Sequence, residues 1–102
     1  MICLLESIDY QGGGLFGFAR SHATKELATN WAEYGIRVNA QYPGGVSSGR
    51  NSELEKPYSA RIPMGRMAQS IDIVGHMLFM VGEASSYMTG QVLYEDGGLS
   101  AW

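Results

Sequence analysis

Apolar residues with helical spacing occur in two segments of the chain. In the first, from Leu15 to Tyr34, apolar side chains recur at intervals of three to five residues, and Gly35 follows as a typical C-terminal cap. The stripe consists of Leu15, Phe18, His22, Leu27, Trp31 and Tyr34. The second segment, from Ile71 to Gly82, is apolar nearly all round, and Ser70 precedes it as an N-cap. The pattern predicts a long helix with one apolar face, and a second helix that is buried on more than one side.

Strand-like and polar segments lie before, between and after these helices. Residues 36–40 alternate as a strand does and are stopped by a Pro-Gly-Gly turn, whereas residues 91–95 form a last strand. Residues 2–5 are a short apolar run that could form a further strand. Residues 47–61 are polar, which predicts a loop with one short helix broken at Pro57. Strands that alternate with helices are typical of an α/β layer with parallel pairing.

Composition and charge narrow the class of protein. The chain has 102 residues, 45% of them apolar, which is typical of a single globular domain. A net charge of −3 argues against a nucleic-acid partner, because such proteins usually carry a basic face. No apolar run reaches the roughly 18 residues of a membrane span, and the first nine residues lack the features of a signal peptide. With Cys3 as the single cysteine, we expect a cytoplasmic protein without a membrane partner.

Several segments resemble the closing third of the short-chain dehydrogenase/reductase family, in order and at the family's spacing. The segments are 13–21, 30–34, 35–46 (GIRVNAQYPGGV), 62–67 (IPMGRM), 72–75, 84–91 (ASSYMTGQ) and 94–98 (YEDGG). The resemblance is strongest to sugar-acid and polyol dehydrogenases such as gluconate 5-dehydrogenase and 2-deoxy-gluconate dehydrogenase. It implies that residues 1–102 are a single truncated domain, the C-terminal part of a Rossmann-like doubly wound α/β fold. This part would hold a long helix and two parallel strands with helices between them.

The resemblance also implies a proton-transfer set of serine, tyrosine and a lysine four residues after the tyrosine, which this chain does not reproduce. In one register Gly12 stands at the lysine position and Ile8 at the tyrosine position, with five extra residues inside the long helix. Tyr10, two positions away from the tyrosine position, is then the catalytic candidate. In a second register Lys25 keeps the lysine, but Ser21 replaces the tyrosine and too few residues remain before the helix end. We therefore expect an incomplete catalytic set.

The same resemblance places cofactor-binding residues in the Pro-Gly turn. In the family this loop lies beside the nicotinamide of NAD or NADP. Pro43 and Gly44 would turn the chain at the carboxyl end of a strand, where open α/β sheets bind ligands. The backbone around Val46 would meet the carboxamide, and Ser48 stands where a threonine hydroxyl often contacts the cofactor.

Other possible sites have simpler structural explanations. Gly12, Gly14 and Gly17 match the spacing of a dinucleotide fingerprint, but no carboxylate ends the next strand, so we favour a glycine-rich helix start. His22 and His76 lie on apolar helix surfaces, which favours packed or interface histidines. No residues have the spacing of metal ligands, and the Asp-Gly-Gly at 96–98 is interpreted as a strand-ending turn.

Three functions remain open from the sequence. The chain is a fragment of an NAD(P)-dependent oxidoreductase for a secondary alcohol or ketone of a sugar acid or polyol, inactive by itself. Alternatively it is a non-catalytic oligomerisation or regulatory subunit of full-length dehydrogenases, or a binding module without chemistry. We expect a homo-oligomer, or docking on a complementary or full-length dehydrogenase chain. The surfaces would be the helix from Leu15 to Tyr34 and the edge of strand 36–40, which lacks its inner neighbour.

Overall fold

A three-stranded parallel sheet forms the centre of the molecule. The computed structural model describes residues 4–5, 15–49 and 52–101. The strands are β1 (Leu4–Leu5), β2 (Ala40–Pro43) and β3 (Val92–Glu95), in the spatial order β1-β2-β3. Parallel strands need a long connection, which here holds the helices. The α/β class with parallel pairing is confirmed.

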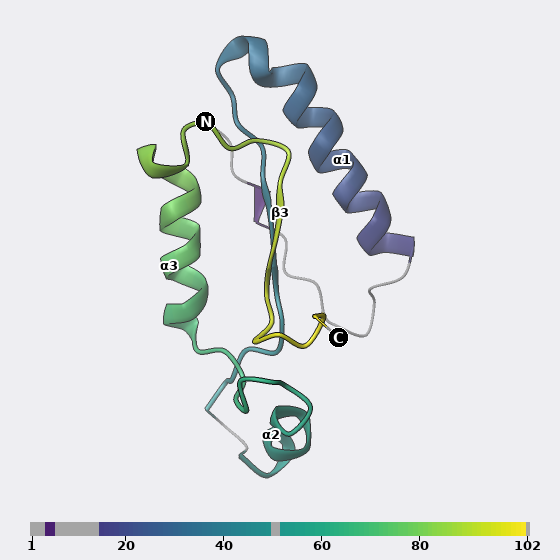
Figure 1. The fold of residues 1–102 in the computed structure, drawn as a ribbon, viewed down its shortest axis with the longest axis vertical. Coiled ribbons are helices and arrows are strands. Elements are labelled where there is room, and N and C mark those ends of the chain that lie inside the picture. The colour runs from purple at the N-terminus through teal and green to yellow at the C-terminus, as the bar shows by residue number, and fades with distance from the viewer. Residues whose placement is uncertain (1–3, 6–14, 50–51, 102) are drawn as a thin grey trace.

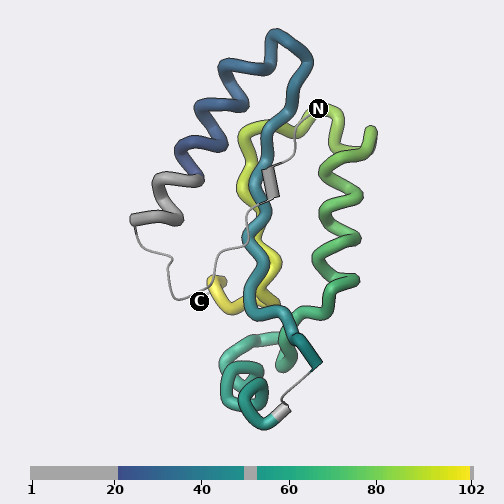
Figure 2. The backbone as a smooth tube through the Cα atoms, turned by 180° about the vertical axis from the view of Figure 1, so that it is seen from behind, coloured from purple at the N-terminus to yellow at the C-terminus, as the bar shows by residue number. Residues whose placement is uncertain are grey.

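Helices cover both faces of this sheet. Helix α1 (Leu15–Trp31) and helix α3 (Ser70–Val81) lie on opposite sides of it, as both views show (Figures 1 and 2). Helix α2 (Ser52–Ser59) lies beyond the end at which β2 and β3 finish (Figure 1). Short 3-10 turns follow α1 and α3: η2 (Ala32–Tyr34) and η3 (Glu83–Ser85). None of these helices is long and apolar enough to cross a membrane, in the part of the chain that the structure describes.

The middle strand begins four residues later than residues 36–40 predict. Val38 and Asn39 are buried beside the sheet, but each binds residues 88–90 partly through a side-chain group rather than through a regular strand ladder. The backbone N–H of Val38 donates to the Thr89 hydroxyl at 3.0 Å, and the Asn39 amide donates to the Met88 carbonyl at 3.0 Å. Because these bonds replace strand pairing, regular pairing begins only at Ala40, opposite Val92.

The expectation that the 36–40 strand lacks an inner neighbour is wrong at the start of β2. Leu4 pairs with Ala40 and Leu5 with Gln41, so β1 takes that place over two residues. The apolar run at 2–5 therefore forms a strand at its described residues. Tyr42 pairs with Tyr94 of β3, and the two rings lie 5.3 Å apart.

Helix α1 packs through small residues rather than through the whole predicted stripe. Thr24 and Ala28, one turn apart, are its buried side chains among residues 21–31. His22 and Tyr34 are exposed, so the interpretation of His22 as a packed histidine is wrong within this chain. The reason is close approach: a Cβ added to Gly90 would lie 3.4 Å from that of Ala28, so a larger residue would push the helix outward.

The two shorter helices also depart from the predicted boundaries. Pro57 lies inside α2 and does not break it, because the carbonyl that loses its N–H partner belongs to the exposed Glu53. Helix α3 begins at Ser70 and its N-cap is Gln69, which forms a capping box with Asp72.

Helix α3 is less buried than its apolar composition predicts. Among its residues only Met80 is fully buried, and Leu78 is 60% exposed. Its exposed large apolar side chains are Ile71, Val74, Leu78, Phe79 and Val81. The prediction that this helix is buried on more than one side is therefore wrong within the chain.

Candidate functional site

The loop of residues 43–49 follows β2 at the carboxyl end of the sheet. Pro43 is the last residue of β2, opposite Glu95, and the Gly44 N–H donates to the Glu95 carbonyl at 2.9 Å. The four predicted cofactor residues (Pro43, Gly44, Val46 and Ser48) belong to this loop. Their position agrees with the edge at which open parallel sheets hold ligands.

Two consecutive glycines allow the 43–49 loop to pass very close to its neighbours. A Cβ on Gly44 would lie 3.0 Å from Asp96 Cα, and a Cβ on Gly45 would lie 2.4 Å from the Tyr58 ring. A distance of 2.4 Å is shorter than any carbon contact allows, so a side chain at position 45 would displace Tyr58 and with it α2. The Pro-Gly-Gly sequence therefore does more than turn the chain, because it also lets the loop pack against α2 and β3.

The loop is also held by the segment that precedes α3. Val46 and Ala68 form an isolated parallel bridge. The Ser47 N–H donates to the Ala68 carbonyl at 2.8 Å, and the Ala68 N–H donates to the Gly45 carbonyl at 2.9 Å. These bonds fix the backbone around Val46, while its side chain remains 40% exposed. A backbone held in this way is ready to present its groups to a ligand.

A third contact comes from α2. The Ser47 hydroxyl donates to the Glu55 carboxylate, with 2.9 Å to each oxygen. The same hydroxyl oxygen accepts the N–H of Gly49 at 3.2 Å. Ser48, between these residues, is exposed. Glu55, Tyr58 and Ala68 were not singled out from the sequence, since nothing in their spacing shows that α2 and the segment before α3 fold back onto the loop.

A cavity of about 170 Å³ opens beside this loop. Its lining consists of Met64, Arg66, Ala68, Asp72, Glu95 and Gly97. The Asp72 carboxylate lies 2.8 Å from Arg66, and this hydrogen bond lowers the pKa of Asp72 to about 2, with help from the Gln69 N–H. The cavity is smaller than the roughly 300 Å³ at which small-molecule sites begin. By itself it is therefore too small for a typical small-molecule ligand.

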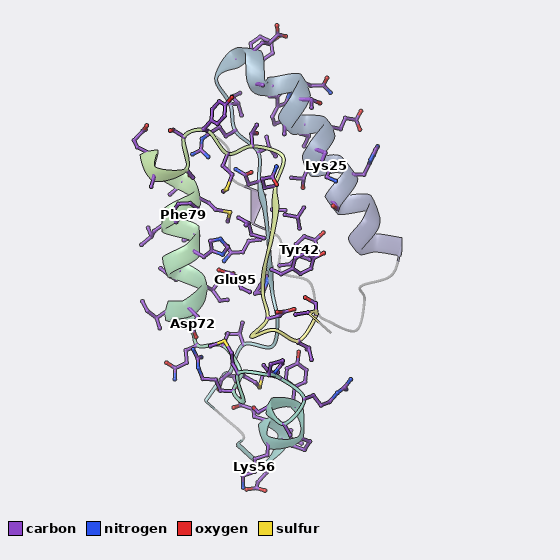
Figure 3. All side chains as sticks on the ribbon, in the orientation of Figure 1. Lys25, Tyr42, Lys56, Asp72, Phe79 and Glu95 are labelled. Carbon is purple, nitrogen blue, oxygen red and sulfur yellow. The ribbon has the colours of Figure 1, made fainter. Side chains whose placement is uncertain are left out.

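A cluster of polar side chains joins α3 to the sheet behind this cavity. His76 Nδ1 contacts Glu95 Oε1, and Gln41 Nε2 donates to the other oxygen of the same carboxylate. The Gln41 amide also donates to the Ile73 carbonyl at 3.1 Å. Gln41 is fully buried, and its Oε1 has no hydrogen-bond partner within the part of the chain that the structure describes. His76 is thus a half-buried histidine bound to a carboxylate, and Glu95 lies between α3 and the sheet (Figure 3).

The predicted catalytic candidate cannot be compared with this site. Tyr10 lies outside the residues that the structure describes, as do Ile8, Gly12 and Gly14. Gly17 lies inside α1. Lys25 is exposed on α1 and projects outward from it, away from the 43–49 loop (Figure 3). The structure therefore places the cofactor candidates together in one loop, and Lys25 does not approach them.

The turn after β3 has the predicted role. The Asp96 carboxylate accepts the N–H of Gly98 at 3.0 Å and that of Ser100 at 2.9 Å. Burial raises the pKa of Asp96, but the hydrogen bonds from Ser100 and Gly98 outweigh it, so the net shift is downward.

Across residues 4–5, 15–49 and 52–101, no three His, Cys, Asp or Glu side chains form a group that could hold a metal ion.

Comparison with known proteins places this site in context. The family model described as enoyl-(acyl carrier protein) reductase matches residues 17–100. The chain is 41% identical over 90 residues to a D-arabinitol 2-dehydrogenase (ribulose-forming) of Scheffersomyces stipitis, covering 79% of this chain and 32% of that protein. It is 37% identical over 114 residues to a 2-dehydro-3-deoxy-D-gluconate 5-dehydrogenase of Bacillus subtilis, covering 96% of this chain and 43% of that protein. The chain thus spans less than half of either relative.

Solved structures agree with these matches. A short chain dehydrogenase from Leptospira borgpetersenii with bound NAD+ superposes with a TM-score of 0.79 and 32% identity, covering 96% of this chain and 44% of that one. A gluconate 5-dehydrogenase from Burkholderia cenocepacia, in complex with NADP and tartrate, gives a TM-score of 0.80 at 25% identity, covering 98% of this chain and 45% of that one. The architecture of this chain is therefore similar to less than half of each of these two larger structures.

Proposed function

Because the chain belongs to the short-chain dehydrogenase/reductase family, we propose that it forms part of an NAD(P)-dependent oxidoreductase. The substrate would be a secondary alcohol or ketone of a sugar acid or polyol. The observation that carries this proposal is the 43–49 loop, held in one conformation at the carboxyl end of the sheet. A bound nicotinamide would supply the hydride acceptor or donor.

The residues present fit the nicotinamide end of such a cofactor. Val46 is exposed on a backbone fixed by two hydrogen bonds to Ala68, so its peptide groups can bind a carboxamide. Ser48 is exposed next to it and has a hydroxyl, a group that can take part in hydrogen bonds to a ligand. Pro43 and Gly44 set the direction in which the chain leaves β2. These residues would bind and orient the cofactor, whereas the proton transfer would need another group.

We propose Tyr10 as the proton-transferring residue of this chain, and we expect it to be weak by itself. No tyrosine in the sequence has a lysine four residues later, so the family's tyrosine–lysine pair is not reproduced. The cavity beside the loop is also too small for a whole dinucleotide. Both observations support a chain that is inactive alone and completes its site only with further residues of the fold.

The proposed substrate class rests on the relatives. Two of them are named for a polyol and for a deoxy sugar acid, respectively. Helix α2 and the cavity both lie beside the cofactor loop, so a small substrate could reach the loop there. The expected compartment remains the cytoplasm, an expectation that rests on the single cysteine.

The exposed apolar face of α3 favours a second candidate function, a non-catalytic subunit. Ile71 and Leu78, 70% and 60% exposed, lie two turns apart on one side of the helix. A surface of this kind marks an interaction site. The partner would be a second copy of the chain or a full-length dehydrogenase. Co-purification with a longer dehydrogenase, without any nucleotide binding by this chain, would favour the second candidate.

Nucleotide binding decides between the two functions. The chain is titrated with NADH and with NADPH, and binding is followed by calorimetry and by the amide NMR signals of Val46, Ser47 and Ser48. The proposal expects weak binding with shifts confined to the 43–49 loop and the segment at Ala68. The oxidoreductase proposal is wrong if neither nucleotide binds at millimolar concentration. Shifts confined to residues remote from the loop would also contradict it.

A further inference from the structure

We propose that Glu55 is a positioning residue for the cofactor loop. By binding Ser47 it fixes the turn that presents Ser48, and so links α2 to the affinity for nicotinamide nucleotides. The inference deepens the proposed function and rests on it, because the ligand of the loop is taken from that proposal. Glu55 would touch neither cofactor nor substrate.

The hydrogen bonds of Ser47 carry the first step of the argument. Its hydroxyl proton is shared between both Glu55 oxygens, and its oxygen accepts the Gly49 N–H. Its backbone N–H is bound to Ala68. Ser47 therefore has its donors committed within the protein, and its role is to hold the chain on either side of Ser48. A hydrogen bond to an ionised carboxylate is about twice as strong as one between neutral groups.

The second step of the argument is the orientation of α2, which turns two side chains toward the loop. Glu55 and Tyr58 are three residues apart and share one face of the helix. Tyr58 packs against Gly45, at the other end of the same loop. Helix α2 thus holds the loop at two points, one polar and one apolar. The opposite side of the helix carries an exposed ion pair, in which Lys56 Nζ lies 2.7 Å from Glu53 Oε1.

The third step of the argument is where the two contacts from α2 lie along the loop. The contacts from Glu55 and Tyr58 lie on either side of Val46, whose backbone is bridged to Ala68. Loss of the Glu55 contact would leave Gly45, Val46 and the Ser47 N–H held by Ala68 and Tyr58. It would release the Ser47 hydroxyl, whose oxygen accepts the Gly49 N–H. The expected consequence is a selective loosening of the Ser48 end, which weakens cofactor binding without unfolding the sheet.

The test compares two substitutions on α2 that remove the same charge. Glu55→Gln weakens the bond to Ser47, whereas Glu53→Gln removes only the exposed pair with Lys56 and is the matched control. We expect Glu55→Gln to weaken NADH binding about tenfold, because a neutral amide oxygen holds the Ser47 hydroxyl more weakly than a carboxylate does. Glu53→Gln should leave the dissociation constant unchanged.

A second measurement is made on the free chain, without nucleotide. Hydrogen exchange of the Gly49 and Ser48 amides should become several times faster in Glu55→Gln and in Ser47→Ala, and a combined variant should add nothing further. Ser47→Ala removes the bond from the loop side, so it replaces Glu55→Gln if that variant does not fold. Equal exchange in Glu55→Gln and Glu53→Gln would overturn the inference. If the wild-type chain binds no NADH while exchange changes as expected, the proposed function fails and the positioning of the loop stands.

Discussion

At the scale of single residues, the most unusual feature is the His76–Glu95–Gln41 cluster between α3 and the sheet. Gln41 is fully buried, which is costly for an amide unless its polar groups are hydrogen-bonded. Its Oε1 has no hydrogen-bond partner among the residues described. Its Nε2 group is bound twice, to Glu95 and to Ile73. Glu95 therefore satisfies two neighbours at once, and removal of any member leaves another without its partner.

We expect His76→Ala to lower the free energy of unfolding by about 1–3 kcal/mol, because one Glu95 oxygen would lose its partner in a mostly buried position. Urea denaturation followed by circular dichroism measures this change in the free energy of unfolding. The matched control is His22→Ala, since His22 is exposed on α1 and should change stability by less than about 0.5 kcal/mol. Equal losses in the two variants would show that the cluster contributes nothing beyond an ordinary surface histidine.

The ion pair of Asp72 and Arg66 predicts how stability depends on pH. The hydrogen bond from Arg66 lowers the pKa of Asp72 from 3.8 to about 2 in the folded chain. A lowered folded pKa means that the unfolded chain binds the proton more readily, so this contribution is complete above pH 4 and is lost as the pH falls toward 2. The urea midpoint of wild type should approach that of Asp72→Asn over this range. A constant difference between pH 5 and pH 2 would contradict this prediction.

At the scale of elements, the sequence predicts which segments are helices or strands better than it predicts what they contact. The last strand, Val92–Glu95, and the body of α3 follow directly from hydrophobic patterning. The start of β2 does not, because Thr89 and Met88, fifty positions away, bind Val38 and Asn39 in place of a strand. Helix boundaries and inner faces are set by tertiary contacts of this kind.

In the candidate site, too, local features could be predicted from the sequence and tertiary contacts could not. Its Pro-Gly loop is recognisable because a strand-ending turn has a local sequence signature. Its supports are not recognisable, because Glu55 and Tyr58 act only after α2 has folded back onto the loop. Gln41 is a further example, since an amide inside a strand segment gives no sign that a histidine-bound carboxylate will face it.

The packing of α2 against the loop can be tested at Gly45, whose surroundings are crowded, with Gly75, whose surroundings are open, for comparison. Gly45→Ala should lower the free energy of unfolding by about 1–3 kcal/mol, because its Cβ would overlap the Tyr58 ring and displace α2. Gly75→Ala, inside α3 with nothing within 4 Å of its Cβ, should raise it by about 0.5–1 kcal/mol through helix propensity. Thermal melts of both variants measure the two changes. A neutral Gly45→Ala would mean that α2 is not held against the loop.

At the scale of the whole molecule, the sheet is covered on both faces but α3 carries an unpaired apolar surface. The chain spans less than half of its relatives, so a partner surface must come from elsewhere in an assembly or a longer fold if this face is to be buried. The face consists of Ile71, Val74, Leu78 and Val81, with Gly75 at its middle, where a neighbouring backbone can approach closely. Burial of such a stripe provides a driving force for association.

We expect Leu78→Lys to shift the chain toward monomer in sedimentation velocity, because a charge at the centre of this face must be desolvated when a second copy covers it. The control is Tyr87→Lys, which changes a fully exposed side chain in the turn after η3 and should leave the distribution as in wild type. The comparison is made at micromolar protein concentration, at which a weak dimer exchanges with its monomer. If wild type is already a folded monomer there, a second copy is not the occupant. The same two variants then report, by co-purification, whether a full-length dehydrogenase binds this face instead.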